Sequence, residues 1–380
     1  MSAQPWIFHN PVKIVFAPGA LERLAEHVSF DRVALVTSPG FARRGLVATI
    51  ERALGNRLVA VVDDVAPNPA MRHVESQAER LRPRSPDALI ALGGGSTIDS
   101  AKALARLLAW PAGTSLAKLL ADEGQSGPAA LPLIAMPTTS GTGAEVTPFG
   151  TVWDYDAHKK RSIAGLDLYP RLALLDPTLT LDLPEEITVS SGLDAISHAL
   201  ESAWNRNANP ASLALVTKSL ELSLAALPRA VREPNDLEAR ADMMQASVLA
   251  GLAISQTRTA LAHAISYPLT ARFGLPHGLA CSFTLPALLR FNAAHDDGRL
   301  DALARALGHG STDDLAARLG ALLEELGMRE RLAARLPERS SIMALAHEMF
   351  APGRAENNVR QASEDEAKAI VAEALDALGL

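Results

Sequence analysis

Three features of the chain predict an α/β domain followed by an all-helical domain. Short apolar runs alternate with amphipathic stretches in the first half of the 380 residues. The runs are almost continuously apolar, as parallel strands covered on both faces require. Beyond about Leu181 the runs stop, and the chain is rich in Ala and Leu with helical periodicity. We therefore expect a doubly wound α/β domain over residues 1–182 and an all-helical domain over residues 183–380.

The elements of both domains follow from these patterns. We expect strands at residues 33–37, 58–62, 88–92, 133–136 and 172–175, with connecting helices that include residues 71–81 and 98–108. A helix begins at Pro184, which two acidic residues follow in the first turn. Further helices are expected at residues 213–227, 237–253 and 313–326.

The composition excludes several classes of partner. A net charge of -7 with 21% charged residues provides no basic face for nucleic acid or an anionic membrane. The single cysteine, Cys281, allows no intrachain disulfide and suits a reducing compartment. We find no secretory signal pattern and no apolar run of about 18 residues. The sequence therefore predicts a cytoplasmic protein without a membrane or nucleic-acid partner.

A glycine-rich turn lies where the third expected strand meets a helix. Gly93, Gly94, Gly95 and Ser96 follow this strand directly. Glycines allow close approach of the backbone to a ligand, and the helix N-terminus offers unpaired N–H groups to a phosphate. The alternative is a tight turn without a ligand, but the strand-to-helix context favours a phosphate. The run is not the GxGxxG of an ordinary Rossmann fingerprint.

A second loop, residues 137–147, follows the fourth expected strand and is rich in small residues and hydroxyls. Such a loop at the carboxyl end of a parallel strand lines a nucleotide or substrate groove. Taken alone, it is equally a polar loop with hydroxyl caps, but its position relative to the glycine-rich turn favours binding.

One acidic residue and three histidines of the helical half form a candidate metal shell. Asp194 and His198 are four residues apart, so a helix places them on one face. His263 lies in another helical stretch, and His277 follows a Gly-Leu-Pro turn. Such a set suits Fe²⁺ or Zn²⁺. Histidines in helices are more often ordinary core or surface residues, and spacing alone leaves both interpretations open.

Together these motifs resemble the iron-containing (group III) alcohol dehydrogenases, relatives of glycerol dehydrogenase and dehydroquinate synthase. The resemblance runs from about Phe16 to the end of the chain. It includes Phe16-Ala-Pro-Gly-Ala-Leu21, Pro67-Asn-Pro69, Gly93-Gly-Gly-Ser-Thr-Ile-Asp-Ser-Ala-Lys102, Pro137-Thr-Thr-Ser-Gly-Thr-Gly-Ala-Glu145, Asp194-x-x-x-His198, His263 and Pro276-His277-Gly278.

The resemblance implies NAD(P)H and Fe²⁺ (or Zn²⁺) as cofactors, a small aldehyde or primary alcohol as substrate, and an active site between the two domains. We also expect a homodimer. The implied metal ligands are Asp194, His198, His263 and His277. The implied cofactor contacts are Gly94, Gly95, Ser96, Asp99, Thr138, Thr139, Thr142 and Lys160.

Two positions depart from the family pattern. Many members have a proton-relaying histidine four residues after the third metal ligand, where this chain has Tyr267. Tyrosine relays protons with a reference pKa of about 10 rather than about 6.5, and a tyrosine packed in the wall of the site is equally expected. Ser38 stands where an acidic residue often selects NADH, so we expect NADPH to be accepted, with Arg43 or Arg44 near its phosphate.

The substrate expectation is more specific. Residues 257–278 resemble the branch that reduces phosphonoacetaldehyde to 2-hydroxyethylphosphonate. Arg258 is the candidate for the phosphonate because its planar fork bonds two oxygens at once, and Phe149 and Ile254 are candidate wall residues. Five residues on a regular helix turn about 140°, so Arg258 needs a helix break near Thr259, or an approach from a neighbouring element, to share a site with His263. The alternative is a surface arginine.

Four rival functions remain. A general short-chain alcohol dehydrogenase would not distinguish charged from uncharged aldehydes. A polyol dehydrogenase of the glycerol type and a dehydroquinate synthase-like lyase share the architecture, but a shell of one Asp and three His speaks against both. A non-catalytic nucleotide-binding or scaffold protein predicts no metal and no turnover.

Overall fold

The computed structural model describes residues 5–121, 127–157, 159–181, 183–350 and 354–380. The chain folds into two compact units, which we call the α/β unit and the helical unit. The α/β unit comprises Asn10–Thr139 and Ala144–Thr180, and the helical unit comprises Met1–His9, Ser140–Gly143 and Leu181–Leu380. Residue 182, where the predicted boundary falls, lies outside the described residues, so that exact boundary stays a prediction.

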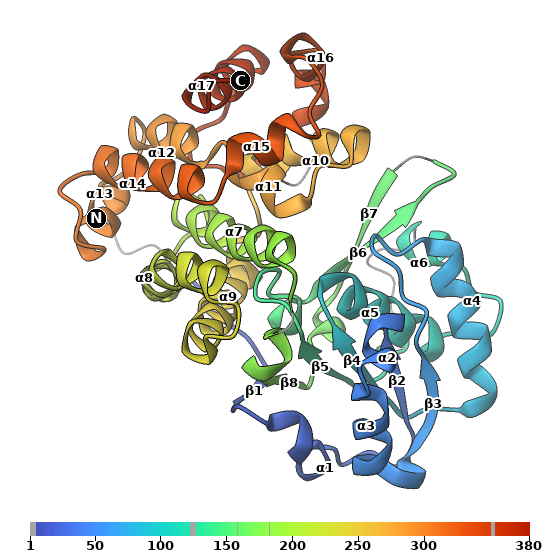
Figure 1. The fold of residues 1–380 in the computed structure, drawn as a ribbon. Helices are drawn as coiled ribbons and strands as arrows, with labels where there is room; N and C mark the ends of the chain where they lie inside the picture. The colour runs from blue at the N-terminus through green and yellow to red at the C-terminus, as the bar shows by residue number, and fades with distance from the viewer. Residues whose placement is uncertain (1–4, 122–126, 158, 182, 351–353) are drawn as a thin grey trace. The chain divides into compact units, whose positions relative to one another are not determined.

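A six-stranded parallel sheet forms the centre of the α/β unit (Figure 1). The strand order is β1-β8-β5-β4-β2-β3. The strands are β1 Lys13–Phe16, β2 Val33–Thr37, β3 Leu58–Val62, β4 Ala88–Gly93, β5 Leu133–Pro137 and β8 Leu172–Leu175. An antiparallel hairpin, β6 Phe149–Asp154 and β7 Lys159–Ala164, stands apart from this sheet. The five expected strands are present, whereas β1 and the hairpin were not expected.

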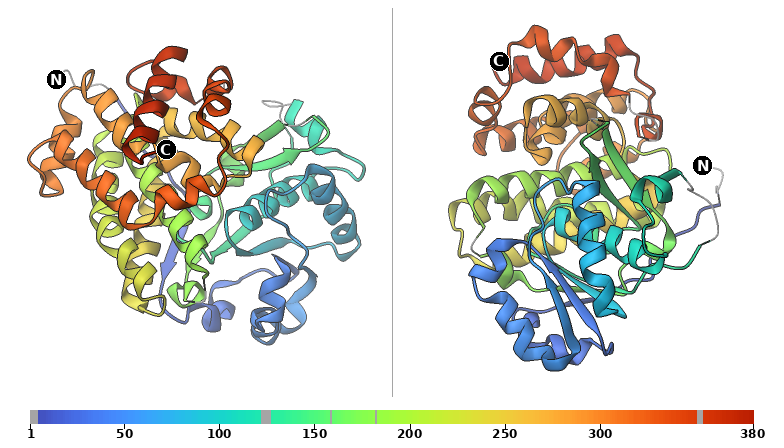
Figure 2. Two further views of the ribbon diagram at one scale, coloured as in Figure 1. Left: turned by 45° about the horizontal axis from the view of Figure 1, so that its top comes forward. Right: turned by 90° about the vertical axis from the view of Figure 1, so that its right-hand side faces the viewer.

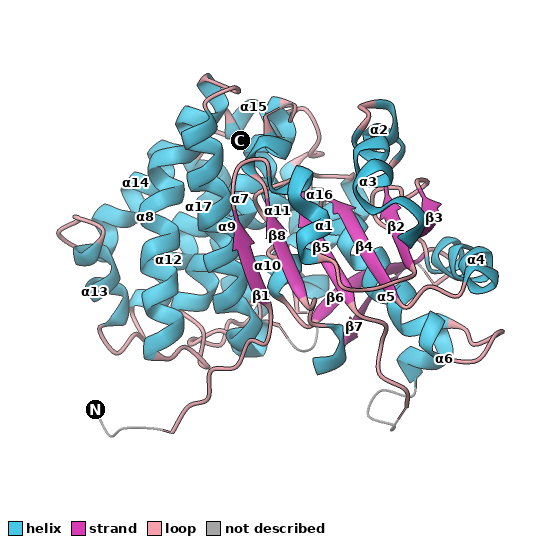
Figure 3. Cartoon of the chain, turned by 90° about the horizontal axis from the view of Figure 1, so that it is seen from below, coloured by secondary structure: helices cyan, strands magenta, loops and turns pink. Residues whose placement is uncertain are grey.

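Helices cover both faces of the sheet, as Figure 3 shows. Alternate residues of β4 point to opposite faces, with Leu89 and Ala91 in one apolar cluster and Ile90 and Leu92 in the other. The first cluster includes residues of α4 Met71–Leu81, α5 Gly95–Ala109 and α6 Leu116–Ala121, and the second includes residues of α1 Leu24–His27, α2 Pro39–Arg43 and α3 Leu46–Leu54. A doubly wound sheet is confirmed for this unit.

The helical unit contains no strand among the described residues after Leu175. Three long helices, α7 Glu185–Ala203, α8 Pro210–Arg232 and α9 Leu237–Thr257, pack together (Figures 1 and 2). The other helices are α10 Leu261–Phe273, α11 His277–Ser282, α12 Leu285–Ala293, α13 Arg299–Ala306, α14 Thr312–Glu325, α15 Met328–Ala333, α16 Arg339–Met343 and α17 Glu364–Ala377. Their apolar faces form one continuous core that includes the fully buried Trp204.

One described helix, α8, is long and apolar enough to cross a membrane. Its buried residues Val216, Leu220 and Leu227 belong to the core shared with α7 and α9. A core helix of this kind passes the same test of length and composition, so this is weak evidence for a membrane span.

Candidate metal centre and nucleotide-binding loop

The connectivity of the sheet creates a switch point between β2 and β4. These strands are neighbours, with Thr37 opposite Leu92, but the chain leaves β2 toward β3 on one side and leaves β4 toward β5 on the other. Ligands of doubly wound sheets bind in the crevice that opens at the carboxyl ends of such strands. Ser38 directly follows β2, and the glycine-rich turn directly follows β4. Both predicted elements therefore lie at the carboxyl ends of two neighbouring parallel strands, the place where ligands of this fold bind.

The glycine-rich turn packs closely against the threonine-rich loop. The N–H of Thr138 donates to the Gly93 carbonyl at 3.1 Å. A Cβ at Gly94 would lie 3.2 Å from the Thr139 Oγ1 atom, so the loop leaves little room for a side chain. Gly94 caps the 15-residue helix α5, whose first N–H groups have no intrahelical partner. This arrangement suits a phosphate at the start of α5.

Asp99 has a structural contact that the sequence does not reveal. Its Oδ2 accepts the N–H of Thr151 at 2.9 Å and so ties helix α5 to strand β6. Burial raises the pKa of Asp99 to about 6, against the attraction of Lys102 and Lys160. Ser96 accepts the N–H of Asn68 at 3.3 Å. Cofactor contacts by Ser96, Asp99 and Lys160 stay predictions.

Thr142 lies in a short segment, Ser140–Gly143, that belongs to the helical unit. A Cβ at Gly141 would lie 2.5 Å from the Ser191 carbonyl oxygen on α7, and one at Gly143 would lie 2.4 Å from the Gly251 Cα on α9. Only glycine permits such close approach to two helices. The predicted cofactor contact of Thr142 therefore belongs to a different unit from that of Thr138 and Thr139.

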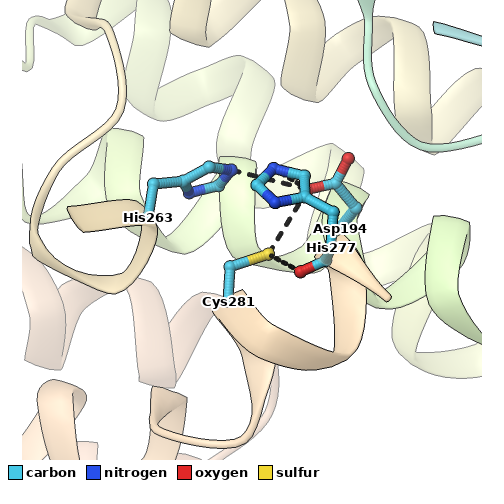
Figure 4. Close-up of side chains that lie close together, drawn as sticks. All are labelled: Asp194, His263, His277 and Cys281. Atoms are coloured by element: carbon cyan, nitrogen blue, oxygen red, sulfur yellow. Dashed lines mark hydrogen bonds and ion pairs between the residues drawn. The ribbon is translucent and has the colours of Figure 1, made fainter. Parts of the chain in front are cut away.

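The four predicted metal ligands converge within the helical unit. Asp194 and His198 come from α7, His263 from α10 and His277 from the first residue of α11. The Nε2 atoms of the three histidines lie 3.6, 3.5 and 3.9 Å from the Asp194 Oδ1 atom, in chain order. Figure 4 shows Asp194, His263 and His277 pointing toward one another.

These distances fit a divalent metal ion. Two ligand atoms about 2.0–2.1 Å from one ion lie about 3.3–3.4 Å apart at a tetrahedral angle. The Nε2 of His263 is buried and forms no hydrogen bond with the described residues. A carboxylate with imidazoles is also the donor set that Fe²⁺ and Zn²⁺ accept. The residues present therefore fit the metal of the predicted family.

Hydrogen bonds at the Nδ1 atoms, on the side of the ring away from Asp194, orient two of the three imidazoles. The His198 Nδ1 donates to the Gly141 carbonyl at 3.2 Å, and the His263 Nδ1 lies 2.7 Å from the Glu201 Oε2. Histidines that bind metals almost always donate their second ring N–H in this way. The glycine loop over α7 thus supplies an acceptor that directs the His198 Nε2 toward Asp194.

The electrostatics of the cluster favour a cation. Burial raises the pKa of Asp194, but the surrounding histidines, His198 above all, hold it well below its usual range. Burial opposes a charge on His263, yet Glu201 and Asp194 raise its pKa to about 10. Without a metal, a proton thus supplies the positive charge between these two carboxylates.

Sequence reasoning missed two residues of this cluster, Glu201 and Cys281. The Cys281 Sγ lies 3.5 Å from the Asp194 Oδ1 and donates to the His277 carbonyl at 3.1 Å (Figure 4). The potential ligand atoms of Asp194, His263, His277 and Cys281 all lie within 4.8 Å of one another. Burial raises the pKa of the thiol well above its usual value. A signal existed, because Cys281 follows His277 by four residues and Glu201 follows His198 by three.

Tyr267 lies beside His277, one of the candidate metal ligands. Its ring stacks on His277 with centroids 6.1 Å apart, and the Arg354 guanidinium carbon lies 4.4 Å from the tyrosine centroid. This position is compatible with a Tyr267 that relays a proton and with a Tyr267 that only packs in the wall of the site.

The residues predicted to contact substrate lie in separate places. Arg258 is exposed and has a left-handed φ of 66° at the end of α9, so the helix break that its role requires is present before α10 begins. Ile254 is buried in α9. Phe149 starts β6 in the α/β unit. Their contacts with a substrate stay predictions.

Comparisons with known proteins agree with these features. Residues 11–177 match the model for iron-containing alcohol dehydrogenase, and residues 188–375 match that for the C-terminal part of the Fe-containing alcohol dehydrogenase family. The chain is 33% identical over 336 residues to a probable alcohol dehydrogenase EutG of Salmonella typhimurium, covering 87% of this chain and 84% of the relative. It is 37% identical over 297 residues to a phosphonoacetaldehyde reductase of Streptomyces viridochromogenes, covering 76% and 74%.

A solved structure has the same fold over nearly its whole length. It is the sulfoacetaldehyde reductase from Bifidobacterium kashiwanohense in complex with NAD⁺, with a TM-score of 0.90 and 32% identity, covering 98% of this chain and 99% of that one. The family expected from the sequence is therefore confirmed. The chain belongs to the iron-containing alcohol dehydrogenase family.

Proposed function

We propose that this chain transfers a hydride between NAD(P)H and a small aldehyde in a metal-dependent reaction. The observation that carries the proposal is the convergence of three Nε2 atoms on Asp194 Oδ1 at 3.5–3.9 Å. In this proposal Asp194, His198, His263 and His277 hold the ion. A bound divalent ion acts as a Lewis acid on the substrate oxygen and so favours hydride transfer at the adjacent carbon. The protein supplies position and electrostatics to the nicotinamide.

The cofactor site is proposed at the start of α5. The switch point between β2 and β4 and the N-terminal N–H groups of α5 support a dinucleotide whose phosphates lie there. The similar sulfoacetaldehyde reductase is in complex with NAD⁺. Tyr267, whose ring stacks on His277, is proposed to relay the proton.

The proposed substrate is an aldehyde that carries an anionic group, with phosphonoacetaldehyde as the first candidate. Two relatives are named for phosphonoacetaldehyde and sulfoacetaldehyde, which both have an acidic group on the carbon next to the aldehyde. Recognition of such an anion requires charge-assisted donors. Arg258, at the helix break three residues before α10, is the first candidate, and Arg354 beside Tyr267 is the second.

We further propose a cytoplasmic homodimer. The negative net charge and the single buried cysteine suit a reducing compartment. Size-exclusion chromatography with light scattering tests the dimer directly.

The test of the substrate compares charged with uncharged aldehydes. The kcat/KM for phosphonoacetaldehyde is expected to exceed that for propanal in the wild type. The variant that loses the anion contact, Arg258→Ala or Arg354→Ala, should lose this preference by about tenfold or more, while its propanal activity stays. Equal kcat/KM values for charged and uncharged aldehydes in the wild type would indicate a general short-chain alcohol dehydrogenase instead.

A further inference from the structure

Glu201 is a buried carboxylate that contacts His263, one of the candidate metal ligands. It lies on α7, one turn after His198, and its relative exposure is 0%. Removal of a carboxylate from water costs several kcal/mol unless strong hydrogen bonds replace the solvent. The contacts that offset this cost therefore indicate what the residue does.

Both oxygens of Glu201 accept hydrogen bonds from one residue, His263. Oε1 accepts the backbone N–H at 3.0 Å, and Oε2 accepts from the ring Nδ1 at 2.7 Å. The backbone N–H belongs to the third residue of α10, where the first turn lacks intrahelical partners, and no side chain of this helix caps it. Glu201 thus fixes the start of α10 and the ring of His263 together.

The second hydrogen bond also determines the tautomer of the imidazole. A carboxylate only accepts hydrogen bonds, so the proton of a neutral His263 ring resides on Nδ1. The lone pair then lies on Nε2, which faces Asp194 Oδ1 at 3.5 Å and forms no hydrogen bond with the described residues. This is the tautomer that a metal at Nε2 requires.

We propose that Glu201 is a positioning residue that holds His263 in the orientation and tautomer needed to bind the metal. The inference rests on the proposed metal site and adds a residue that binds neither metal nor substrate. Its specific consequence is that replacement of one carboxylate oxygen by an amide NH₂, which keeps the shape of the side chain and removes its charge, should impair metal binding.

Glutamine is the informative substitution because it keeps the shape of the side chain but has only one acceptor. The backbone N–H of His263 cannot change its role and takes the amide oxygen. The amide NH₂ then faces Nδ1, which must become the acceptor. The proton moves to Nε2, and the atom that faces the metal site loses its lone pair.

The experiment measures Zn²⁺ affinity by chelator competition and the ring tautomers by ¹⁵N NMR of histidine-labelled protein, with His263 assigned from His263→Ala. We expect Glu201→Gln to bind Zn²⁺ about 10–100-fold more weakly than the wild type, with the Nε2–H tautomer at His263. The matched control is Glu145→Gln, which alters a buried glutamate of the α/β unit and should bind Zn²⁺ normally.

The possible outcomes separate this inference from the proposed function. If the wild type binds no Zn²⁺, Fe²⁺ or Co²⁺, the metal site itself is wrong. If Glu201→Gln binds within about threefold of the wild type, or keeps the Nδ1–H tautomer, only the role of Glu201 is wrong. Should Glu201→Gln fail to fold, the Zn²⁺-loaded wild type decides: Zn²⁺ on Nδ1 of His263 with the proton on Nε2 contradicts the proposal.

Discussion

The Asp194 Oδ1 atom is approached by His198 Nε2 at 3.6 Å and by Cys281 Sγ at 3.5 Å. Both distances suit ligands of one ion, because an oxygen about 2.0 Å and a sulfur about 2.3 Å from zinc lie about 3.5 Å apart. The hydrogen bonds distinguish the two side chains. The His198 Nδ1 is held by Gly141, as a metal-binding imidazole usually is, whereas the thiol already donates to the His277 carbonyl. We therefore prefer His198 as the fourth ligand.

This preference gives the first prediction. Cys281→Ser should retain metal stoichiometry, and His198→Ala should lose at least about tenfold in affinity because it removes a ligand. The Co²⁺-loaded wild type should lack the intense thiolate-to-cobalt charge-transfer band. A strong band that Cys281→Ser abolishes would instead assign the thiol as a ligand.

Ser38 gives a second prediction, which concerns the choice between NADPH and NADH. It follows β2 at the switch point, and its side chain does not cap α2. A carboxylate at this place would bond the ribose hydroxyls of NADH and repel the 2′-phosphate of NADPH. We expect the wild type to accept NADPH at least as well as NADH, and Ser38→Asp to shift the ratio of kcat/KM values toward NADH by about tenfold or more. A wild type that prefers NADH more than about tenfold would contradict this.

The sequence predicts part of the metal centre for clear physical reasons. Asp194 and His198 are one helical turn apart, so their shared face follows from spacing alone. The approach of His263 and His277 depends on how α10 and α11 pack on α7, which no local pattern contains. The sequence pattern named those two residues only as candidates, and the family resemblance, rather than geometry, selected them. Glu201 was missed because a glutamate near a helix end usually lies in solvent.

At the scale of elements, the packing of α11 on α7 positions His277. A Cβ at Gly278 would lie 1.7 Å from the Ser190 carbonyl oxygen, which is backbone and cannot rotate away. Gly278→Ala should therefore push α11 away from α7, destabilise the protein by about 1–3 kcal/mol and weaken metal binding through His277.

The control for this third prediction is Gly320→Ala. Gly320 lies within α14, and nothing approaches the position of its Cβ. Alanine there should stabilise the helix by about 0.5–1 kcal/mol and leave metal affinity unchanged. Urea unfolding and Zn²⁺ titration of both variants provide the comparison. Normal Zn²⁺ affinity in Gly278→Ala would show that the close contact does not position His277.

The elements that the sequence did not predict have a common cause. Strand β1 is an edge strand with mostly exposed residues. In the hairpin, β6 alternates buried with partly buried positions, and β7 is mostly exposed and carries Lys159, Lys160 and Arg161. Continuous apolar runs identify parallel strands, the apolar edge strand β3 included, and overlook edge strands of mixed polarity such as β1 and two-stranded ribbons. The central strands, buried on both faces, were predicted to within one residue.

For the whole molecule, buried charges of the α/β unit predict an unusual dependence of stability on pH. Burial raises the pKa of Glu145 to about 7, so the folded protein binds a proton that the unfolded chain has released. The stabilisation that this proton provides is fully present below the pKa that Glu145 has in the unfolded chain. It is lost as the pH rises through about 7. Burial lowers the pKa of Lys102 to about 8, so stability rises again above pH 8, where the unfolded chain still binds that proton.

Glu145→Gln tests the acidic part of this dependence, since glutamine resembles the protonated carboxyl. The free energy of unfolding of the variant minus that of the wild type should be about 1–3 kcal/mol larger at pH 8 than at pH 5. Urea unfolding at both pH values measures the difference. The same difference from the wild type at pH 5 and pH 8 would show that Glu145 does not titrate in this range.

The central claim is that Asp194 and the three histidines hold a metal on which turnover depends. The most direct measurement is aldehyde-dependent NADPH oxidation by metal-stripped wild type and His263→Ala after anaerobic addition of Fe²⁺ or Zn²⁺, with bound metal quantified in the same samples. The wild type should bind one ion per chain and regain activity, whereas His263→Ala should remain folded by circular dichroism and inactive. A fully active His263→Ala protein, or a wild type equally active without metal, would contradict the account.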